Sequence, residues 1–364
     1  MRPLLQERPL RMPLTSRRSM EGGLYFGQAP WNPDRLTAGA MARAQPSGAA
    51  VPGMLSLNNL LNQMSAGGLT ATSLWTPPLD RQLSRCAGRV MRAIVLNCIP
   101  ETPESNLPLA LATLDMPNLL AGLALLKHAV PHRTTIIVSD RGDRQLYRQL
   151  KAVRRKQNVR LTPLVNRYPL TQPTVLLHSL FGCRLPVDAL PTEVGVLLAD
   201  PVACWALGRF VRFGLPVTHR PVQVFRLHAA PALGLAEIGV PLAAFLSECN
   251  APCEGQQCIV NGMLTGRKVD PKVAGVTLDT QSIALRPAPV EEISYPCIRC
   301  GWCVDHCPTG LNPAWLFAQA PRNTAESRAQ ASHCVSCGLC SYVCPSRLPL
   351  TAAIVRLRAS GHEV

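Results

Sequence analysis

Short apolar runs alternate with longer helix-like segments through the middle of the chain. Residues 91–97 (MRAIVLN), 134–139 (TTIIVS) and 159–165 are rich in Val, Ile and Leu, which is typical of buried strands. Residues 117–130 and 141–156 lie between these runs and have the length and pattern of helices. Because strands alternate with helices, the pattern predicts a parallel α/β sheet.

The alternation ends near residue 215. The run 194–198 (VGVLL) predicts another strand, and 202–213 predicts a helix that Asp200 and Pro201 open as cap and first-turn residues. We therefore expect one α/β domain over 55–215.

The segments on either side of this domain have different patterns. Residues 216–267 predict a strand, a small-residue turn, a short helix and a second strand, which indicates a compact α+β module. Residues 268–292 contain three prolines and little periodicity, so we interpret them as a linker. Residues 1–54 are rich in Pro, Arg, Gly and Ala, and we interpret them as an irregular arm.

The charge balance favours acidic partners. Lys and Arg number 37 against 22 Asp and Glu, a formal net charge of +15. Eight of the basic residues fall between 140 and 160, where they form either a docking face or, as we favour, a solvated helix face. The run contains a single aromatic residue, Tyr147, so it does not favour nucleic-acid binding.

The sequence gives no clear membrane or export signal. Residues 1–20 lack an apolar run of signal-peptide length. The most apolar long segment, 109–130, is interrupted by Asp115, Pro117 and Lys127, which are costly in a bilayer. We therefore expect a cytoplasmic protein, peripheral at most on the cytoplasmic face of the inner membrane.

The C-terminal part carries the chemistry. Two copies of Cys-x2-Cys-x2-Cys-x3-Cys-Pro stand at 297–308 and 334–345, and together they hold eight of the fifteen cysteines. In this motif the first three thiolates bind one [4Fe-4S] cluster, and the fourth ligates the neighbouring cluster. We therefore predict two crossed ligand sets: Cys297, Cys300, Cys303 and Cys344 for cluster 1, and Cys307, Cys334, Cys337 and Cys340 for cluster 2.

Structural zinc is the alternative for these cysteines, because Cys-x2-Cys pairs also bind zinc. Tetrahedral zinc gives no reason for a third and fourth cysteine at these offsets in both copies, so we favour iron and sulfur. Residues 312–320 and 325–332 predict helices between the motifs. The segment 293–364 is thus expected to be a helical, ferredoxin-type domain that passes electrons between two clusters.

The order of these pieces resembles the C subunit of the Rnf electron transport complex and the related cobalamin reductase of propanediol-utilising microcompartments. The similarity is strongest from Cys297 onward and continues in fainter landmarks at 182–186 (GCRLP), 194–196 (VGV) and 261–266 (NGMLTG). It implies a flavin-binding sheet domain related to a complex I subunit, then a β-grasp module, then the dicluster domain.

The resemblance also implies a function. It indicates a subunit that passes single electrons between a soluble carrier (ferredoxin, flavodoxin or a flavoprotein) and other subunits of a membrane-bound redox complex. Where the family has a Gly-rich flavin loop, this chain has SAGGLTATS at 65–73, so we expect a degenerate flavin site. Two alternatives stay open: an FMN-dependent NADH oxidoreductase that feeds the same clusters, and a nucleic-acid-associated iron–sulfur protein.

Overall fold

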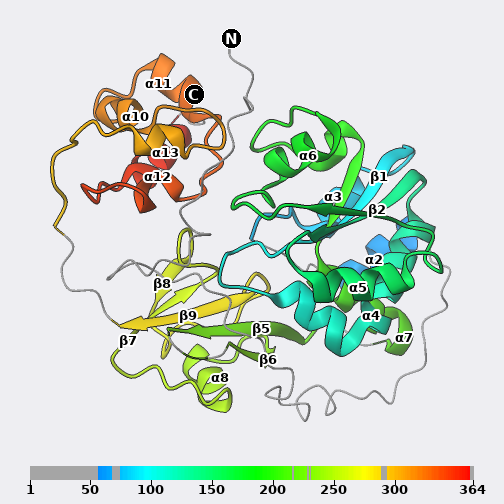
Figure 1. Ribbon diagram of the computed structural model, residues 1–364. Helices are drawn as coiled ribbons and strands as arrows, with labels where there is room; N and C mark the ends of the chain where they lie inside the picture. The colour runs from blue at the N-terminus through cyan, green and yellow to red at the C-terminus, as the bar shows by residue number, and fades with distance from the viewer. Residues whose placement is uncertain are drawn as a thin grey trace.

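The computed structural model describes residues 56–67, 74–214, 217–227, 229, 231–287 and 293–360. The arm expected over 1–54 and most of the altered flavin loop, 68–73, lie outside these residues. The described elements form two sheet-containing parts and a C-terminal group of helices (Figure 1).

The first part is built on a four-stranded parallel sheet of order β3-β2-β1-β4. Its elements are α2 (Leu57–Gly67), α3 (Leu79–Ser84), β1 (Met91–Cys98), α4 (Leu107–Ala129), β2 (His132–Asp140), α5 (Arg144–Val153), β3 (Arg160–Leu164), α6 (Pro173–Phe181), the 3-10 turn η3 (Pro191–Val194), β4 (Val196–Ala199) and α7 (Pro201–Phe213). The parallel α/β sheet expected from the sequence is therefore present.

The sheet is covered on both faces, which explains its unbroken apolar strands. In β1, Ile94 and Leu96 pack with α2, α3, α4, α5 and α7, whereas Ala93 and Val95 point to the other face and pack with α6. Only Arg92 in this strand is exposed. Because successive side chains alternate between faces, both faces of the strand must be apolar.

Helix α4 is one of the core helices of this domain. By length and composition, it is the one described helix that could cross a membrane, and 56% of its most apolar stretch is buried inside the protein. It is kinked at Asp115 and contains Pro117. Gly122 approaches the backbone of α7 at Cys204, and Gly208 of α7 approaches the backbone of α4 at Asn118. These reciprocal glycines let the two helices pack closely.

The second part is a five-stranded mixed sheet of order β6-β5-β9-β7-β8, with β5 and β9 parallel at its centre. Its elements are β5 (His219–Arg226), β6 (Ala232–Glu237), α8 (Leu242–Glu248), β7 (Gln256–Val260), β8 (Arg267–Val269) and β9 (Ser282–Pro287). The sequence predicts a linker over 268–292, and this prediction is wrong for residues 268–287. They complete this sheet, and Ile283 and Leu285 of β9 lie in its core.

The sequence pattern does not reveal β9, because this strand is short and the flanking segments contain proline and glycine. It pairs with β5 and β7, and its apolar residues pack in a core that includes β6 and α8, all of which lie outside the segment 268–292. Residues 288–292 of the expected linker lie outside the described part of the chain.

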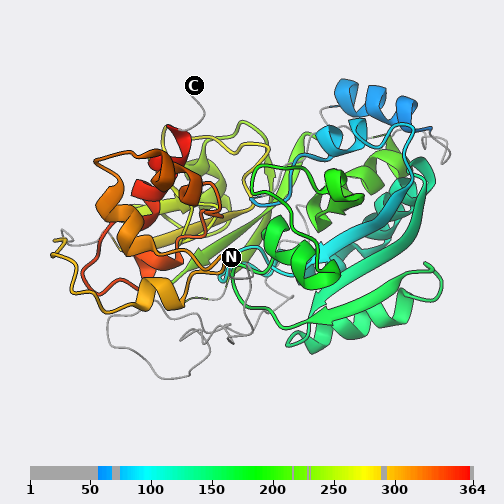
Figure 2. The same ribbon diagram turned by 90° about the horizontal axis from the view of Figure 1, so that it is seen from above.

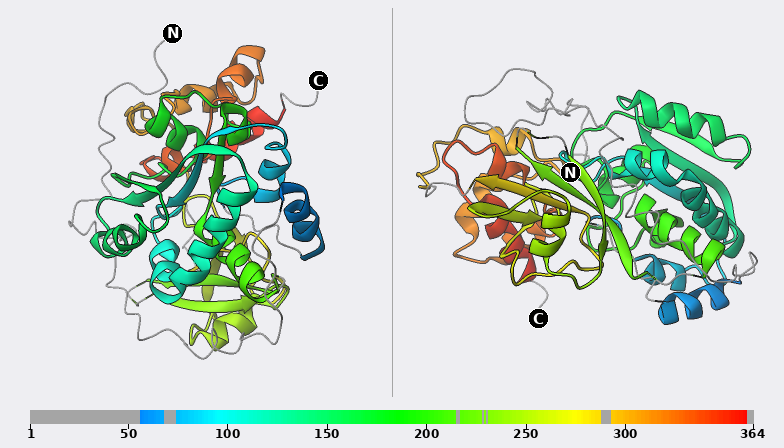
Figure 3. Two further views of the ribbon diagram at one scale, coloured as in Figure 1. Left: turned by 90° about the vertical axis from the view of Figure 1, so that its right-hand side faces the viewer. Right: turned by 90° about the horizontal axis from the view of Figure 1, so that it is seen from below.

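The C-terminal group consists of short helices and loops. They are α9 (Trp302–Asp305), α10 (Pro313–Gln319), α11 (Ala325–Ala331), α12 (Leu339–Tyr342) and α13 (Leu350–Ala359). Leu316, Ile354 and Leu357 form its small core together with several cysteines. Figures 2 and 3 show these helices over the second sheet, on the same side of the α/β domain.

Candidate iron–sulfur site

The two cysteine motifs have the same backbone conformation. Arg299 and Ser336, which each precede the second cysteine of their motif, have φ of 57° and 55°. Gly301 and Gly338, which follow that cysteine, have φ of 82° and 80° and start the matching helices α9 and α12. The repeat in the sequence is therefore also a repeat in structure.

Each motif contributes three cysteines to one cavity and one cysteine to the other. The first cavity is lined by Cys297, Cys300, Cys303 and Cys344. The second is lined by Cys307, Cys334, Cys337 and Cys340. The eight cysteines thus lie in two groups of four, each drawn from both motifs.

The cysteines surround a space and do not meet at a point. Among the described residues no three His, Cys, Asp or Glu side chains converge closely enough to hold a single metal ion. All fifteen cysteines are free thiols. Four sulfurs around an open cavity match the donor set of a cubane cluster, whose irons bind one thiolate each.

The second cavity is the more deeply buried of the two. Cys334, Cys337 and Cys340 are buried, whereas Cys297 and Cys300 of the first cavity are exposed. Burial raises the pKa of Cys340 to about 11 and that of Cys337 further. These thiols need a bound cation to become thiolates at neutral pH, and a metal centre supplies it.

Backbone and hydroxyl groups contact the sulfurs of the second cavity. Leu311 N donates to Cys307 Sγ at 3.3 Å, and Ser336 N donates to Cys334 Sγ at 3.4 Å. The Thr351 hydroxyl lies 3.2 Å from Cys340 Sγ. Contacts of this kind stabilise negative charge on sulfur and tune the potential of a bound cluster.

The second cavity also contacts the two sheet domains. The Tyr168 hydroxyl donates to the Cys337 carbonyl at 2.7 Å, and its ring lies 6.5 Å from that of Trp75. On the other side, a Cβ on Gly338 would come within 2.5 Å of the Leu264 carbonyl. Sequence reasoning did not find Tyr168 as a functional residue, because its partner is 169 residues away and no local motif marks it.

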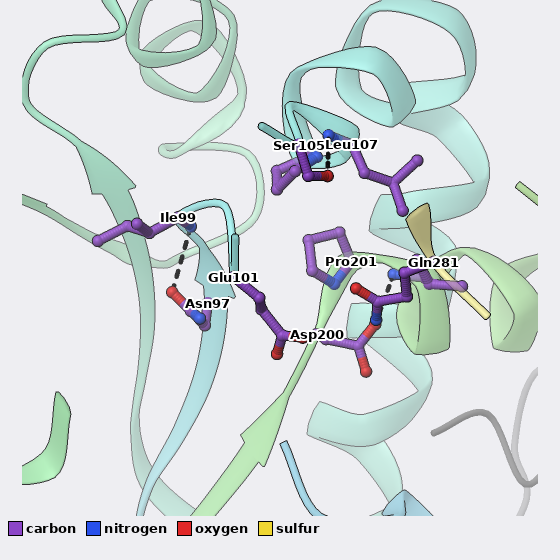
Figure 4. Close-up of a pocket in the computed structure, with 10 residues that line it drawn as sticks. Asn97, Ile99, Glu101, Ser105, Leu107, Asp200, Pro201 and Gln281 are labelled. Carbon is purple, nitrogen blue, oxygen red and sulfur yellow. Dashed lines mark hydrogen bonds between the residues drawn. The ribbon is translucent and has the colours of Figure 1, made fainter. Parts of the chain in front are cut away.

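A third cavity lies where strands β1 and β4 end, the edge at which parallel sheets bind ligands. Figure 4 shows Glu101, Asp200 and Gln281 around it. Asp200 Oδ1 accepts from Val202 N and Ala203 N, so its carboxylate takes the first amides of α7. A phosphate bound at the N-terminus of α7 would accept hydrogen bonds from the same amides.

The charges at this edge are neutralised within the chain. Arg220 of β5 is buried beside Asp200, and Asp200 and Glu101 both act electrostatically on it. Burial lowers the pKa of Arg220 to about 10, an effect that the carboxylates of Asp200, Asp279 and Glu101 oppose. Glu101 in turn accepts hydrogen bonds from Leu74 N and the Thr76 hydroxyl. The described residues at this edge therefore do not fit the phosphate of a flavin.

The other candidate features have ordinary surroundings. Cys258 lies in the core of the second sheet domain, with Cys249 and Cys253 packed against it. On α5, Leu146 and Leu150 are buried, whereas Arg144, Arg148 and Lys151 are exposed. The basic run thus lies mainly on the solvated face of that helix.

Comparison with known families agrees with this geometry. Residues 293–348 match the family model described as "4Fe-4S dicluster domain". The C-terminal segment is therefore an iron–sulfur domain.

Similar proteins are C subunits of ion-translocating oxidoreductase complexes. The chain is 29% identical to the Salmonella dublin protein over 208 residues, which are 55% of this chain and 29% of that protein. It is 30% identical to the Rhodobacter capsulatus protein over 45% of this chain and 32% of that one. It is 22% identical to the Buchnera aphidicola protein over 72% of this chain and 57% of that one. The alignments thus span between about a third and just over half of these relatives.

The fold is similar to that of chains in two crystal structures of an NAD+-reducing [NiFe]-hydrogenase. The air-oxidized structure gives a TM-score of 0.55 at 16% identity and covers 77% of this chain and 55% of that one. The H2-reduced structure gives 0.57 at 14% identity, with coverage of 82% and 59%. At these identities the likeness concerns the fold alone. In sequence, the chain is similar to the C subunit of ion-translocating oxidoreductase complexes, as its motifs indicate.

Proposed function

We propose that this chain is an electron-transfer subunit of an Rnf-like redox complex and carries two [4Fe-4S] clusters. The observation that carries the proposal is the pair of cavities, each lined by four cysteines drawn from both motifs. The similarity to the C subunit of ion-translocating oxidoreductase complexes supports the setting.

The proposed ligands are the crossed sets, Cys297, Cys300, Cys303 and Cys344 for one cluster and Cys307, Cys334, Cys337 and Cys340 for the other. A cluster bound in each cavity supplies a centre that accepts and donates one electron. The chain holds the two cavities side by side, since Cys307 and Cys344 join each motif to the neighbouring cavity. Buried Leu311, Leu339 and Leu348 help to exclude water around them.

In this proposal the chain itself uses no flavin. The support lies at the carboxyl edge of the first sheet. There Asp200 accepts hydrogen bonds from the first amides of α7, and carboxylates neutralise Arg220. The partners would be the other subunits of a membrane-bound complex and a soluble one-electron carrier. The location would be the cytoplasm or the cytoplasmic face of the inner membrane.

The second sheet domain is proposed to be a β-grasp module. Counting its strands in chain order, the sheet runs 2-1-5-3-4, with a helix between strands 2 and 3 and the first and last strands parallel at the centre. Its role would be structural, because Leu264 and Met263 of this module contact the dicluster domain and the α/β domain, respectively.

The test is an assay of iron, sulfide and flavin on full-length protein prepared without oxygen, followed by electron paramagnetic resonance of the dithionite-reduced sample. We expect about eight irons and eight sulfides per chain, no flavin, and the signals of two interacting reduced clusters. Recovery of zinc in place of iron would overturn the proposal. Bound FMN together with bleaching of the clusters by NADH would instead establish the NADH oxidoreductase alternative.

A further inference from the structure

Exposed apolar side chains are concentrated beside the first cavity. Of the nine large hydrophobic residues that are exposed in the described part of the chain, five fall between residues 293 and 304. They are Ile293 (62% exposed), Tyr295 (56%), Ile298 (67%), Trp302 (52%) and Val304 (38%). Isolated exposed apolar residues are normal, but a concentration of them in one short stretch of chain is typical of an interaction site. We call these five residues the apolar patch.

The patch is held next to the ligands of the first cavity. Ile298 lies between Cys297 and Cys300 in sequence and lines the cavity with them, and Trp302 directly precedes Cys303. Tyr295 N donates to the Ser346 carbonyl at 3.0 Å, which fixes the start of this segment beside the end of the second motif. Two exposed cysteines, Cys297 and Cys300, therefore lie within the same stretch of chain as the patch.

The two cavities differ in what lies next to them. The second is buried and contacts the α/β domain through Tyr168 and the second sheet domain through Leu264. The first reaches the surface. Electron transfer slows steeply with distance, so an external carrier exchanges electrons fastest with the centre nearest the surface. Of the two proposed clusters, the one in the first cavity lies nearer the surface.

The charges around the patch select the partner. Arg299 lines the first cavity and is exposed, as is Arg347, whose carbonyl accepts from the Ser294 hydroxyl at 3.0 Å. Residues 293–360 contain six arginines against two acidic residues, Asp305 and Glu326. The whole chain has a formal net charge of +15. Complementary charge steers association, so the patch fits an acidic protein with an apolar contact surface.

We propose that the apolar patch is the docking surface for a small acidic one-electron carrier protein, which exchanges electrons with the cluster held by Cys297, Cys300, Cys303 and Cys344. This inference rests on the proposed electron-transfer function. The step moves one electron between the reduced carrier and the oxidised cluster, or in the reverse direction, and no bond forms or breaks. Aromatic residues such as Trp302 and Tyr295 are typical anchors at the centre of such interfaces.

The experiment uses full-length holoprotein without oxygen and an acidic ferredoxin with two [4Fe-4S] clusters as the probe. The variants are Trp302→Glu and Tyr295→Glu, neither of which removes a cysteine. The matched control is Val273→Glu, which places the same charge on the second sheet domain at a position that is 84% exposed. Affinity and the rate of electron transfer are measured at low and at high salt.

We expect each patch variant to weaken ferredoxin binding and slow electron transfer at least about tenfold, while the control changes either by less than about twofold. Binding of the unmutated protein should weaken steeply with salt. Iron content and reduction by dithionite should be the same in all four proteins. Failure of the unmutated protein to bind iron or to be reduced would overturn the proposed function itself.

Four results would overturn the docking inference while leaving the clusters in place. They are equal binding by patch and control variants, salt-independent binding, self-association of the chain that the patch variants abolish, and binding to anionic lipid vesicles that depends on Trp302. The third would assign the patch to a second copy of this chain, and the fourth to a membrane surface.

Discussion

The hydroxyl of Tyr168 donates to the carbonyl of Cys337 at 2.7 Å and joins the α/β domain to the buried cavity of the dicluster domain. Burial raises the pKa of Tyr168 well above its usual value, so the hydroxyl stays protonated and can donate. The bond fixes the backbone of a proposed cluster ligand to a residue of a different domain.

Replacing Tyr168 by Phe should loosen this junction. The variant keeps the ring but leaves the Cys337 carbonyl without its side-chain donor, which costs about 1 kcal/mol. We expect a lower denaturant midpoint for loss of the cluster absorbance, with unchanged iron content. Tyr295→Phe is the control, because that side chain is exposed. Equal midpoints for the two variants would show that the bond does not support the junction.

The crossed ligand sets make a prediction that uncrossed sets do not. Cys344 belongs to the second motif but lines the first cavity with Cys300. Cys344→Ser should therefore perturb the same cluster as Cys300→Ser, and Cys307→Ser the same cluster as Cys337→Ser. Loss of one cluster should remove roughly half of the iron. Electron paramagnetic resonance of the reduced variants checks the pairing, and identical spectra for Cys344→Ser and Cys337→Ser would contradict it.

Gly301 and Gly338 form a matched pair for testing how the dicluster domain docks. Both have positive φ, near 80°, so alanine at either site carries a backbone cost of about 1 kcal/mol. Only at Gly338 would the added Cβ collide with the Leu264 carbonyl, whereas nothing lies within 4 Å at Gly301.

Gly338→Ala should consequently be the more destabilising change, by a further 1–3 kcal/mol or so for overpacking. Limited proteolysis and chemical denaturation should both show earlier release of the C-terminal domain in this variant than in Gly301→Ala. The same behaviour in both variants would mean that the contact with Leu264 adds nothing to the docking.

Alkaline pH should weaken the α/β domain through its buried thiols. Burial raises the pKa of Cys86 from 9.0 to about 11, and its thiol donates to the Gln82 carbonyl at 3.4 Å. The folded pKa lies above the unfolded one, so the stabilisation is complete below pH 9 and is lost as the pH rises toward 11.

Urea midpoints measured across this range should fall, and the fall should be smaller in Cys86→Ala, which no longer titrates there. The variant is expected to be less stable at every pH, because it leaves a cavity in the core. Only the slope of the urea midpoint against pH tests whether Cys86 is the titrating group. The same slope in the variant and the unmutated protein would contradict this assignment.

The sequence by itself determined the features that depend on local spacing. The duplicated cysteine motif predicted the repeated loops and the crossed sets, and the apolar runs at 91–97, 134–139 and 194–198 predicted the strands that became β1, β2 and β4. The repeated loops and the three strands are confirmed, because the spacing of a motif and two-sided burial leave direct marks on neighbouring residues. The crossed ligand sets stay a prediction.

The tertiary structure decided everything that needed a distant partner. The sequence pattern indicates a linker where β9 lies, because β9 pairs with β5 and β7 and is buried against residues of other elements, including α8. Tyr168 and Cys337 meet across two domains, and Arg220 of the second module neutralises carboxylates of the first. A hydrogen bond or a buried charge is fixed by whatever packs against it, and such contacts between remote segments leave no periodicity in the chain.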